Sequence, residues 1–190
     1  MNEVKNISRY PVPEFNDLPE DIKETILSFQ EKLGFIPNVL MALAHRPDEF
    51  RAFLAYNNAV MGKESGLTAA EKEMIIIAHS NHNGCIYCVA SHGAVLRLET
   101  NDPALSEKIA VNYHEADITP RQKAMIAFAM KVTTDSRSIN EEDFETLRGH
   151  GFSDEDIWDI AAITSFFNLS NRMMNFAAIR PDDEFYAMGR

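Results

Sequence analysis

The stretch from Thr68 to His92 constrains this chain more than any other, because it predicts two helices separated by a break and contains both cysteines of the protein. Thr68 is a good N-cap, Glu71 stands where a capping box needs an acidic residue, and an apolar run follows. Asn83-Gly84 then interrupts the helical pattern. A helix, a tight break and a second helix are therefore expected around the two thiols.

The cysteines are spaced C-x-x-C, and a histidine follows about one helical turn later. If Cys85 starts the second helix, Cys85, Cys88 and His92 share one face. Glu73 lies twelve residues before Cys85, one turn into a mostly apolar helix, where an unpaired carboxylate is costly to bury. We expect His92 to be its partner, which places a thiol pair beside an acid–base pair.

Size, charge and hydropathy exclude several classes of function. The chain has 190 residues, enough for one domain or two small ones with a substantial core. A net charge of −11 argues against binding to nucleic acid, which needs a basic face. No apolar run reaches the roughly 18 residues of a membrane span, and the first residues lack the apolar core of a signal peptide. We therefore expect a cytoplasmic protein with no nucleic-acid or membrane partner.

In the cytoplasm a C-x-x-C pair is more often catalytic or metal-binding than structural. Because the chain has no second cysteine pair, a closed zinc site is not expected. We predict no metal and no cofactor.

Helical periodicity continues along the rest of the chain, and no period-two strand pattern is present. Residues 1–16, with two prolines, are typical of an extended arm, and residues 17–190 are expected to form a single all-α domain. The remaining expected helices are 17–33, capped by Asp17 and stopped by Gly34; 39–44; 47–61, with Ala59 turned inward; one from Asn101 or Asp102 to about Val111; one from Thr119-Pro120 through Met130; 140–149; and 153–179.

The pattern of the helix that begins after Thr68 recurs 51 residues later. Leu67-Thr68, Lys72, Met74-Ile75 and Ala78 have as counterparts Ile118-Thr119, Lys123, Met125-Ile126 and Ala129. The second copy carries Ala124 in place of Glu73, and no cysteine follows it. A duplicated helical unit, spanning about 67–111 and then 118–180, explains this pattern; chance similarity between two amphipathic helices is the alternative.

The set of Glu73, Cys85, Cys88 and His92 resembles the alkyl hydroperoxidase D-like family, also called the carboxymuconolactone decarboxylase superfamily. The shared pattern is a glutamate twelve positions before C-x-x-C-x-x-x-H. Three short sequence segments match the peroxidase-related branch of this family: Asn83-Gly84-Cys85-Ile86-Tyr87-Cys88, Leu33-Gly34-Phe35-Ile36-Pro37-Asn38 and Ala44-His45-Arg46-Pro47. The resemblance covers most of the chain and implies the all-α alkyl hydroperoxidase D-like fold.

The resemblance also implies a thiol-dependent peroxidase, an antioxidant enzyme with peroxiredoxin-type activity. In the implied relay Glu73 orients His92, His92 takes the proton of Cys88, and the Cys88 thiolate attacks the peroxide O–O bond. Cys85 then attacks the resulting sulfenic acid, which releases water and leaves a redox-active disulfide. A dithiol donor, of lipoyl type or a thioredoxin-like protein, must reduce that disulfide.

Two effects bear on which cysteine reacts with the peroxide, and they favour different residues. The helix N-terminus acts most strongly on Cys85, and in many redox C-x-x-C helices the first cysteine is the more reactive. Proximity to His92 favours Cys88, since the imidazole can share its proton and so lower its pKa. The resemblance points to Cys88 as well, and we adopt that assignment.

Three further residues are candidates for accessory roles. Tyr87 stands between the cysteines, where better-known peroxidase members carry a histidine, and we expect core packing or a pocket wall. His79 and His82 lie near the end of the helix that begins after Thr68, where they can approach the site. The simpler expectation is that both are solvated turn residues. Nine methionines and twelve phenylalanines indicate a large core and a subunit interface, so we expect a homo-oligomer.

Three rival functions remain open from the sequence. A redox sensor or interaction module uses the disulfide as a reversible switch without turnover. A carboxymuconolactone decarboxylase-type lyase does not need the cysteine pair. A metal-binding role would draw on the cysteines with His79, His82 and His92.

Overall fold

The computed structural model describes residues 6–190, and within that range every regular element is helical. The helices are α1 (Glu20–Leu33), α2 (Asn38–Leu43), α3 (Pro47–Met61), α4 (Ala69–His82), α5 (Ile86–Thr100), α6 (Leu105–Asn112), α7 (Pro120–Asp135), α8 (Glu141–Gly149), α9 (Asp154–Ala177) and α10 (Glu184–Ala187), with 3₁₀ turns at Phe15–Asp17 and Ser136–Ser138. The predicted all-α fold is confirmed.

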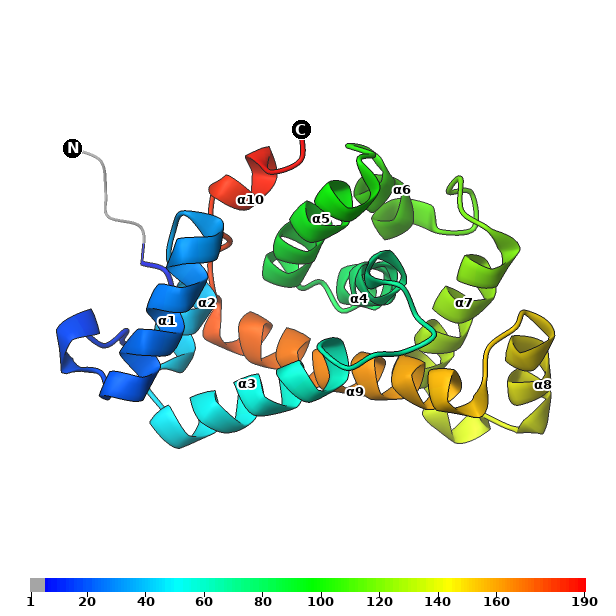
Figure 1. Cartoon of the computed structure of the whole chain (residues 1–190), viewed down its shortest axis with the longest axis horizontal. Coiled ribbons are helices and arrows are strands. Elements are labelled where there is room, and N and C mark those ends of the chain that lie inside the picture. Colours follow the sequence, from blue (N-terminus) through cyan, green and yellow to red (C-terminus); the bar gives the residue numbers. More distant parts are fainter. Residues whose placement is uncertain (1–5) are drawn as a thin grey trace.

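Helix α4 forms the centre of the molecule. It is seen end-on in Figure 1 and packs against α5, α6, α7 and α9. Every residue from Glu71 to Ser80 is buried. A helix that is buried all round must pair its polar side chains inside the protein, so each charge on α4 is expected to have a partner.

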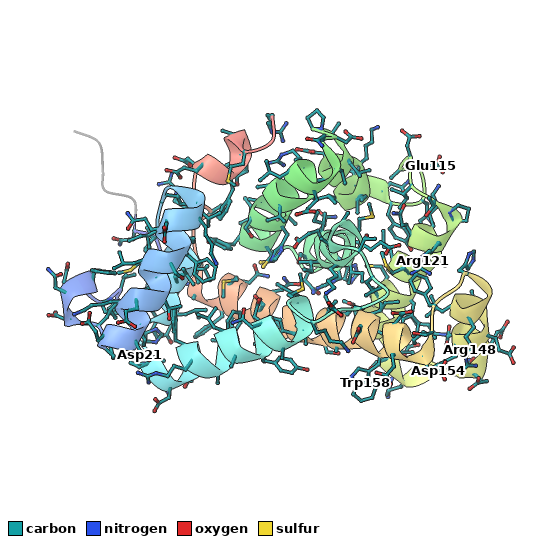
Figure 2. The ribbon with its side chains drawn as sticks, viewed as in Figure 1. Asp21, Glu115, Arg121, Arg148, Asp154 and Trp158 are labelled. Carbon is teal, nitrogen blue, oxygen red and sulfur yellow. The ribbon has the colours of Figure 1, made fainter. Side chains whose placement is uncertain are left out.

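The charged residues near the start of α4 have such partners. Lys72 Nζ donates to the carbonyl oxygens of Met61, at 2.9 Å, and Lys63, at 3.1 Å. Glu71 Oε1 accepts from Nε of Arg121, at 3.2 Å, and Arg121 is labelled in Figure 2 at the start of α7. These contacts hold the start of α4 against the preceding loop and against α7.

Three clusters of buried apolar side chains build the core. The largest lies between α4, α7 and α9, and a second joins α1, α2 and α3. The third surrounds Cys85 and Cys88 and includes Met174 of α9 and Phe185 of α10. The two cysteines therefore lie in an apolar layer where α5 meets α9 and the C-terminal segment.

Local capping chemistry sets most helix boundaries as predicted. Capping boxes begin four helices, and they pair Thr68 with Glu71, Thr119 with Gln122, Asn140 with Asp143, and Ser153 with Asp156. Helix α1 ends at Gly34, whose φ of 85° lies in the left-handed region that glycine adopts without strain.

The cap predicted at Asp17 is wrong. Asp17 lies in a 3₁₀ turn, and α1 begins at Glu20 with Pro19 as its N-cap. Leu18 precedes the proline and is extended, with φ −72° and ψ 151°, as residues before proline prefer. The helix therefore cannot extend back to Asp17.

The cap predicted at Asn101 or Asp102 is also wrong. Asn101 ends α5 in the left-handed region, with φ 52°, which asparagine tolerates better than most residues. Asp102 accepts from the backbone of Ala104 within the turn, and α6 starts only at Leu105. Two smaller corrections concern Ala59, which is exposed, and α10, which was not predicted.

Part of the expected N-terminal arm is described. Residues 6–14 contain no helix or strand, and residues 1–5 lie outside the described residues. The arm runs beside the end of α9, where Arg9 N donates to Ala177 O at 2.6 Å and Arg180 N donates to Ile7 O at 2.9 Å. Across residues 6–190, no helix is at once long enough and apolar enough for a membrane crossing.

Candidate active site

Glu73 of α4 and His92 of α5 form the pair that the sequence predicts. Glu73 Oε2 lies 2.7 Å from Nδ1 of His92, and Glu73 is 6% exposed. The ring of His92 also packs edge-on against Phe167 of α9, with ring centroids 4.7 Å apart. With Nδ1 held by the carboxylate, Nε2 is the nitrogen available for proton transfer.

The break between α4 and α5 places both sulfurs at the start of α5. Gly84, with φ 66°, turns the chain, and Cys85 N then donates to Ser80 O at 2.9 Å. Cys85 is the N-cap of α5, and its sulfur faces the backbone N–H of Cys88 at 3.4 Å. The two Sγ atoms are 2.6 Å apart, and both residues are free cysteines buried to 1% and 2% exposure.

The order of acidity of the two thiols is the reverse of the expected one. The hydrogen bond between the two sulfurs lowers the pKa of Cys85, and the backbone N–H of Cys88 and the charge of His92 add to this effect against burial. The same sulfur–sulfur contact and burial raise the pKa of Cys88. The contact therefore favours ionisation of Cys85, the N-cap sulfur, over ionisation of Cys88, and the backbone donors at the start of the helix point to the same sulfur.

A cavity of about 420 Å³ opens beside the pair. Cys88, His92 and Glu73 belong to its lining, whereas Cys85 does not. Most of the remaining wall is apolar and comes from several helices, with Leu40, Leu43, Phe53, Phe167 and Met174 as examples. Of the two sulfurs, Cys88 is therefore the one that faces the cavity.

Tyr87 lines the same cavity as a buried wall residue. Its hydroxyl donates to Asp182 Oδ2 at 3.1 Å, and the carboxylate of Asp182 accepts from the backbone N–H of Asn38 at 3.0 Å. Burial raises the pKa of Tyr87, so its hydroxyl stays protonated. The residue joins α5 to the start of α2 and to the C-terminal segment.

The expectation of a solvated turn residue is wrong for His79 and fits His82. His79 is fully buried because α4 is covered on every side, and burial lowers its pKa to about 4. Its Nδ1 donates to Ile75 O at 2.7 Å, and Nε2 has no partner among the described residues. His82 is exposed. Residues 6–190 contain no grouping of three or more histidine, cysteine, aspartate or glutamate side chains that could hold a metal ion.

Sequence reasoning missed Asn171 of α9. It is fully buried, and its amide lowers the pKa of both thiols. The signal was present, since asparagine is a poor helix former and Asn168, Asn171 and Asn175 recur on successive turns in the C-terminal half of the helix.

Comparison with known proteins identifies a matching family and similar solved structures. Residues 47–101 match the model of the carboxymuconolactone decarboxylase family. The crystal structure of an alkylhydroperoxidase AhpD core, an uncharacterized peroxidase-related protein from Ralstonia eutropha JMP134, is 59% identical with a TM-score of 0.96, and the match covers 97% of both chains. An uncharacterized peroxidase-related protein from Silicibacter sp. TM1040 is 41% identical with a TM-score of 0.93 over the whole of both chains.

A more distant likeness shows the fold alone. The debrominase Bmp8, solved in complex with 2,3,4-tribromopyrrole, is 20% identical with a TM-score of 0.79, over 95% of this chain and 97% of that one. None of the curated proteins compared with the chain matches it.

Proposed function

The chain belongs to the carboxymuconolactone decarboxylase superfamily, in its alkyl hydroperoxidase D-like, peroxidase-related branch, and from this premise we propose that it is a thiol-dependent peroxidase that reduces organic hydroperoxides through the Cys85–Cys88 dithiol. The observation that carries the proposal is the contact of the two sulfurs, at 2.6 Å, beside the buried Glu73–His92 pair and at the wall of a cavity.

In the first step the singly ionised dithiol reacts with the hydroperoxide ROOH. The Cys88 sulfur attacks the terminal oxygen while its proton passes to the Cys85 thiolate across the sulfur–sulfur contact. The O–O bond breaks, Cys88 becomes a sulfenic acid, Cys85 becomes a thiol, and RO⁻ leaves. The imidazolium of His92, stabilised by Glu73, protonates RO⁻ to the alcohol.

In the second step the neutral imidazole of His92 takes the proton of Cys85. The Cys85 thiolate attacks the sulfenic sulfur of Cys88, the S–O bond breaks, and the departing hydroxide takes that proton back from His92 as water. The product is the Cys85–Cys88 disulfide. Two electrons have moved from the sulfurs to the peroxide.

The third step regenerates the enzyme with a dithiol donor, of lipoyl type or a thioredoxin-like protein. A donor thiolate attacks Cys88, which lines the cavity, and Cys85 leaves as the thiolate. Since a thiol of lower pKa leaves faster, the lowered pKa of Cys85 suits it to this role. The second donor thiol then releases Cys88 and leaves the donor as a disulfide.

The cavity supports an organic substrate over hydrogen peroxide. Its volume of about 420 Å³ lies in the range of small-molecule pockets, whereas a water-sized molecule fills roughly 30 Å³. An apolar wall favours an apolar R group by burial of its surface.

Steady-state assays test the proposal. Purified protein is given cumene hydroperoxide or hydrogen peroxide with dihydrolipoamide, beside C85S and C88S. We expect dithiol-linked turnover, at least about tenfold faster for cumene hydroperoxide because burying two carbon groups of methylene size is worth about 1.6 kcal/mol and about 1.4 kcal/mol corresponds to a factor of ten, and loss of turnover in both variants. Oxidation without turnover supports the redox-sensor alternative. An unchanged rate in C88S contradicts the proposed mechanism.

Self-association and a cytoplasmic location stay predictions. The outer face of α9 carries exposed apolar side chains at Trp158, Leu169 and Phe176, and Figure 2 shows Trp158 projecting from that helix. We propose a homo-oligomer that covers this face; a monomeric mass in solution would contradict it.

A further inference from the structure

The last residues of the chain form part of the wall of the cavity beside Cys88. Phe185 of α10 and Met188, which follows that helix, both belong to the lining, and α10 packs against α5 (Figure 1). The ring of Phe185 meets the rings of Phe35 and Tyr87 edge-on, with centroids 5.2 Å and 6.1 Å away. Phe185 and Met188 therefore limit the space that a ligand can occupy in the cavity.

A helix as short as α10 does not hold this wall in place by itself. It spans four residues, Glu184–Ala187, and isolated helices shorter than about 12 residues are marginal in water. The position of the segment must therefore come from its contacts with the rest of the fold.

Arg97 of α5 supplies the central contacts. Its Nε donates to the carbonyl oxygen of Met188 at 2.9 Å, and its Nη2 donates to that of Phe185 at 2.5 Å. The two carbonyls that Arg97 holds thus belong to the same two residues whose side chains line the cavity. Arg97 is buried, with 4% of the residue exposed, and a buried charge that loses its acceptors is costly. The arginine and the wall therefore stabilise each other.

Contacts on either side leave the segment little freedom. Gly189 lies so close to α5 that a Cβ atom in its place would be 2.7 Å from Cβ of Arg97. Before α10, the carboxylate of Asp182 accepts from the Tyr87 hydroxyl at 3.1 Å and from the backbone N–H of Asn38 at 3.0 Å. The wall is anchored both before and after its two lining residues.

We propose that Phe185 and Met188 set the size of the organic group that can reach Cys88, and that Arg97 is the positioning residue that holds this wall. The inference deepens the proposed function, because it names what selects the R group of the hydroperoxide, and it rests on that function only for the identity of the substrate. A group too large for the cavity of about 420 Å³ must displace a packed aromatic ring to reach Cys88. Removal of the ring or of its anchor admits such a group.

The test measures alkylation of Cys88 in the C85S protein, where it is the only thiol. N-ethylmaleimide and N-pyrenylmaleimide carry the same reacting group on a small and on a bulky substituent, so the ratio of their rate constants reports the space around Cys88. F185A removes the ring, and R97M removes both donors but keeps a long side chain. We expect the ratio of the bulky to the small reagent to rise about tenfold in both variants, the scale of the penalty for overfilling a packed site.

R121M is the matched control. Arg121 of α7 also donates to two backbone carbonyls, those of Gly66 and His150, but it does not belong to the cavity lining. A loss of stability alone would change the ratio in R121M as much as in R97M, whereas loss of the wall changes it only in R97M.

The outcomes separate this inference from the proposed function, because alkylation needs no peroxide. Ratios in F185A and R97M equal to that in R121M overturn the inference, even if the enzyme turns over hydroperoxide. Ratios raised in both uphold it, even if no peroxide is reduced, and a ratio raised in F185A alone overturns the role of Arg97. If R97M does not fold, G189A, whose added methyl group would collide with the same arginine, is measured with the same outcomes.

Discussion

Helices α4 and α7 begin with the same kind of capping contacts, but only α4 carries a residue of the candidate active site. Both start after a threonine N-cap closed by a capping box, at positions 51 residues apart. The lysine one position after the box also behaves alike in both: Lys72 Nζ donates to the carbonyls of Met61 and Lys63, and Lys123 Nζ donates to that of His114. The duplication predicted from the sequence stays a prediction, but the two starts are built by the same contacts.

The two helices differ in their surroundings and in the segment to which each one leads. Helix α4 is buried on all sides and continues through Gly84 to the thiols, whereas α7 has several half-exposed or exposed positions and continues into a 3₁₀ turn. Glu73 and His79 of α4 correspond to Ala124 and Met130 of α7. Capping residues decide where each helix begins, and a few inward-facing residues decide which one can carry chemistry.

The largest expected effect comes from making α4 resemble α7 at Glu73, the carboxylate that orients His92. E73A leaves His92 without the carboxylate that orients it, and loss of such an acid–base element costs about 10²–10⁴ in rate. Steady-state hydroperoxide turnover measures the effect. The reciprocal variant A124E is the control and is expected to keep wild-type turnover; a fall in A124E as large as that in E73A would break the comparison.

A second substitution of the same kind, H79M, removes a dependence of stability on pH. The pKa of His79 is about 4 in the folded protein and about 6.5 when unfolded, so the unfolded state binds the extra proton between these values. The favourable contribution is complete above pH 6.5 and is lost as the pH falls towards 4, by about 3 kcal/mol in total.

Urea unfolding at several pH values measures this loss. Wild-type protein should lose more stability than H79M between pH 7 and pH 4, with the difference opening below pH 6.5. Equal losses in the two proteins would show that His79 is not held neutral by burial.

The smallest expected effect concerns the shared caps. T68A and T119A each remove one capping hydroxyl, which costs about 1 kcal/mol of unfolding free energy. T68A is expected to cost at least as much as T119A, because Glu71 is buried and Gln122 is half-exposed. Chemical denaturation compares the two, and a clearly larger cost for T119A would contradict this order.

Local chemistry explains how much of this structure was predictable. The starts at Thr68, Thr119 and Ser153 follow from residues within one turn of each cap, and the Glu73–His92 pair follows from the cost of burying an unpaired carboxylate. No feature outside those short stretches is needed for these predictions.

The failures depend on contacts across the fold. Burial of His79 follows from the helices that surround α4, which periodicity does not reveal. The order of acidity of the thiols depends on which sulfur donates in a contact of 2.6 Å, and the burial of Asn171 depends on the packing of α9 against α4. Distance along the sequence hides the burial of His79 and of Asn171, whereas the two cysteines are only three residues apart and it is their side-chain geometry that the sequence does not give.

The central claim is that hydroperoxide oxidises the two sulfurs in order, Cys88 first. One equivalent of cumene hydroperoxide is added to reduced protein, and free thiols and intact mass are followed over time. We predict loss of both thiols together in the wild-type protein, with formation of the Cys85–Cys88 disulfide, and arrest of C85S as a Cys88 sulfenic acid. Intact thiols in the wild-type protein, or a sulfenic acid that forms in C88S but not in C85S, would contradict this account.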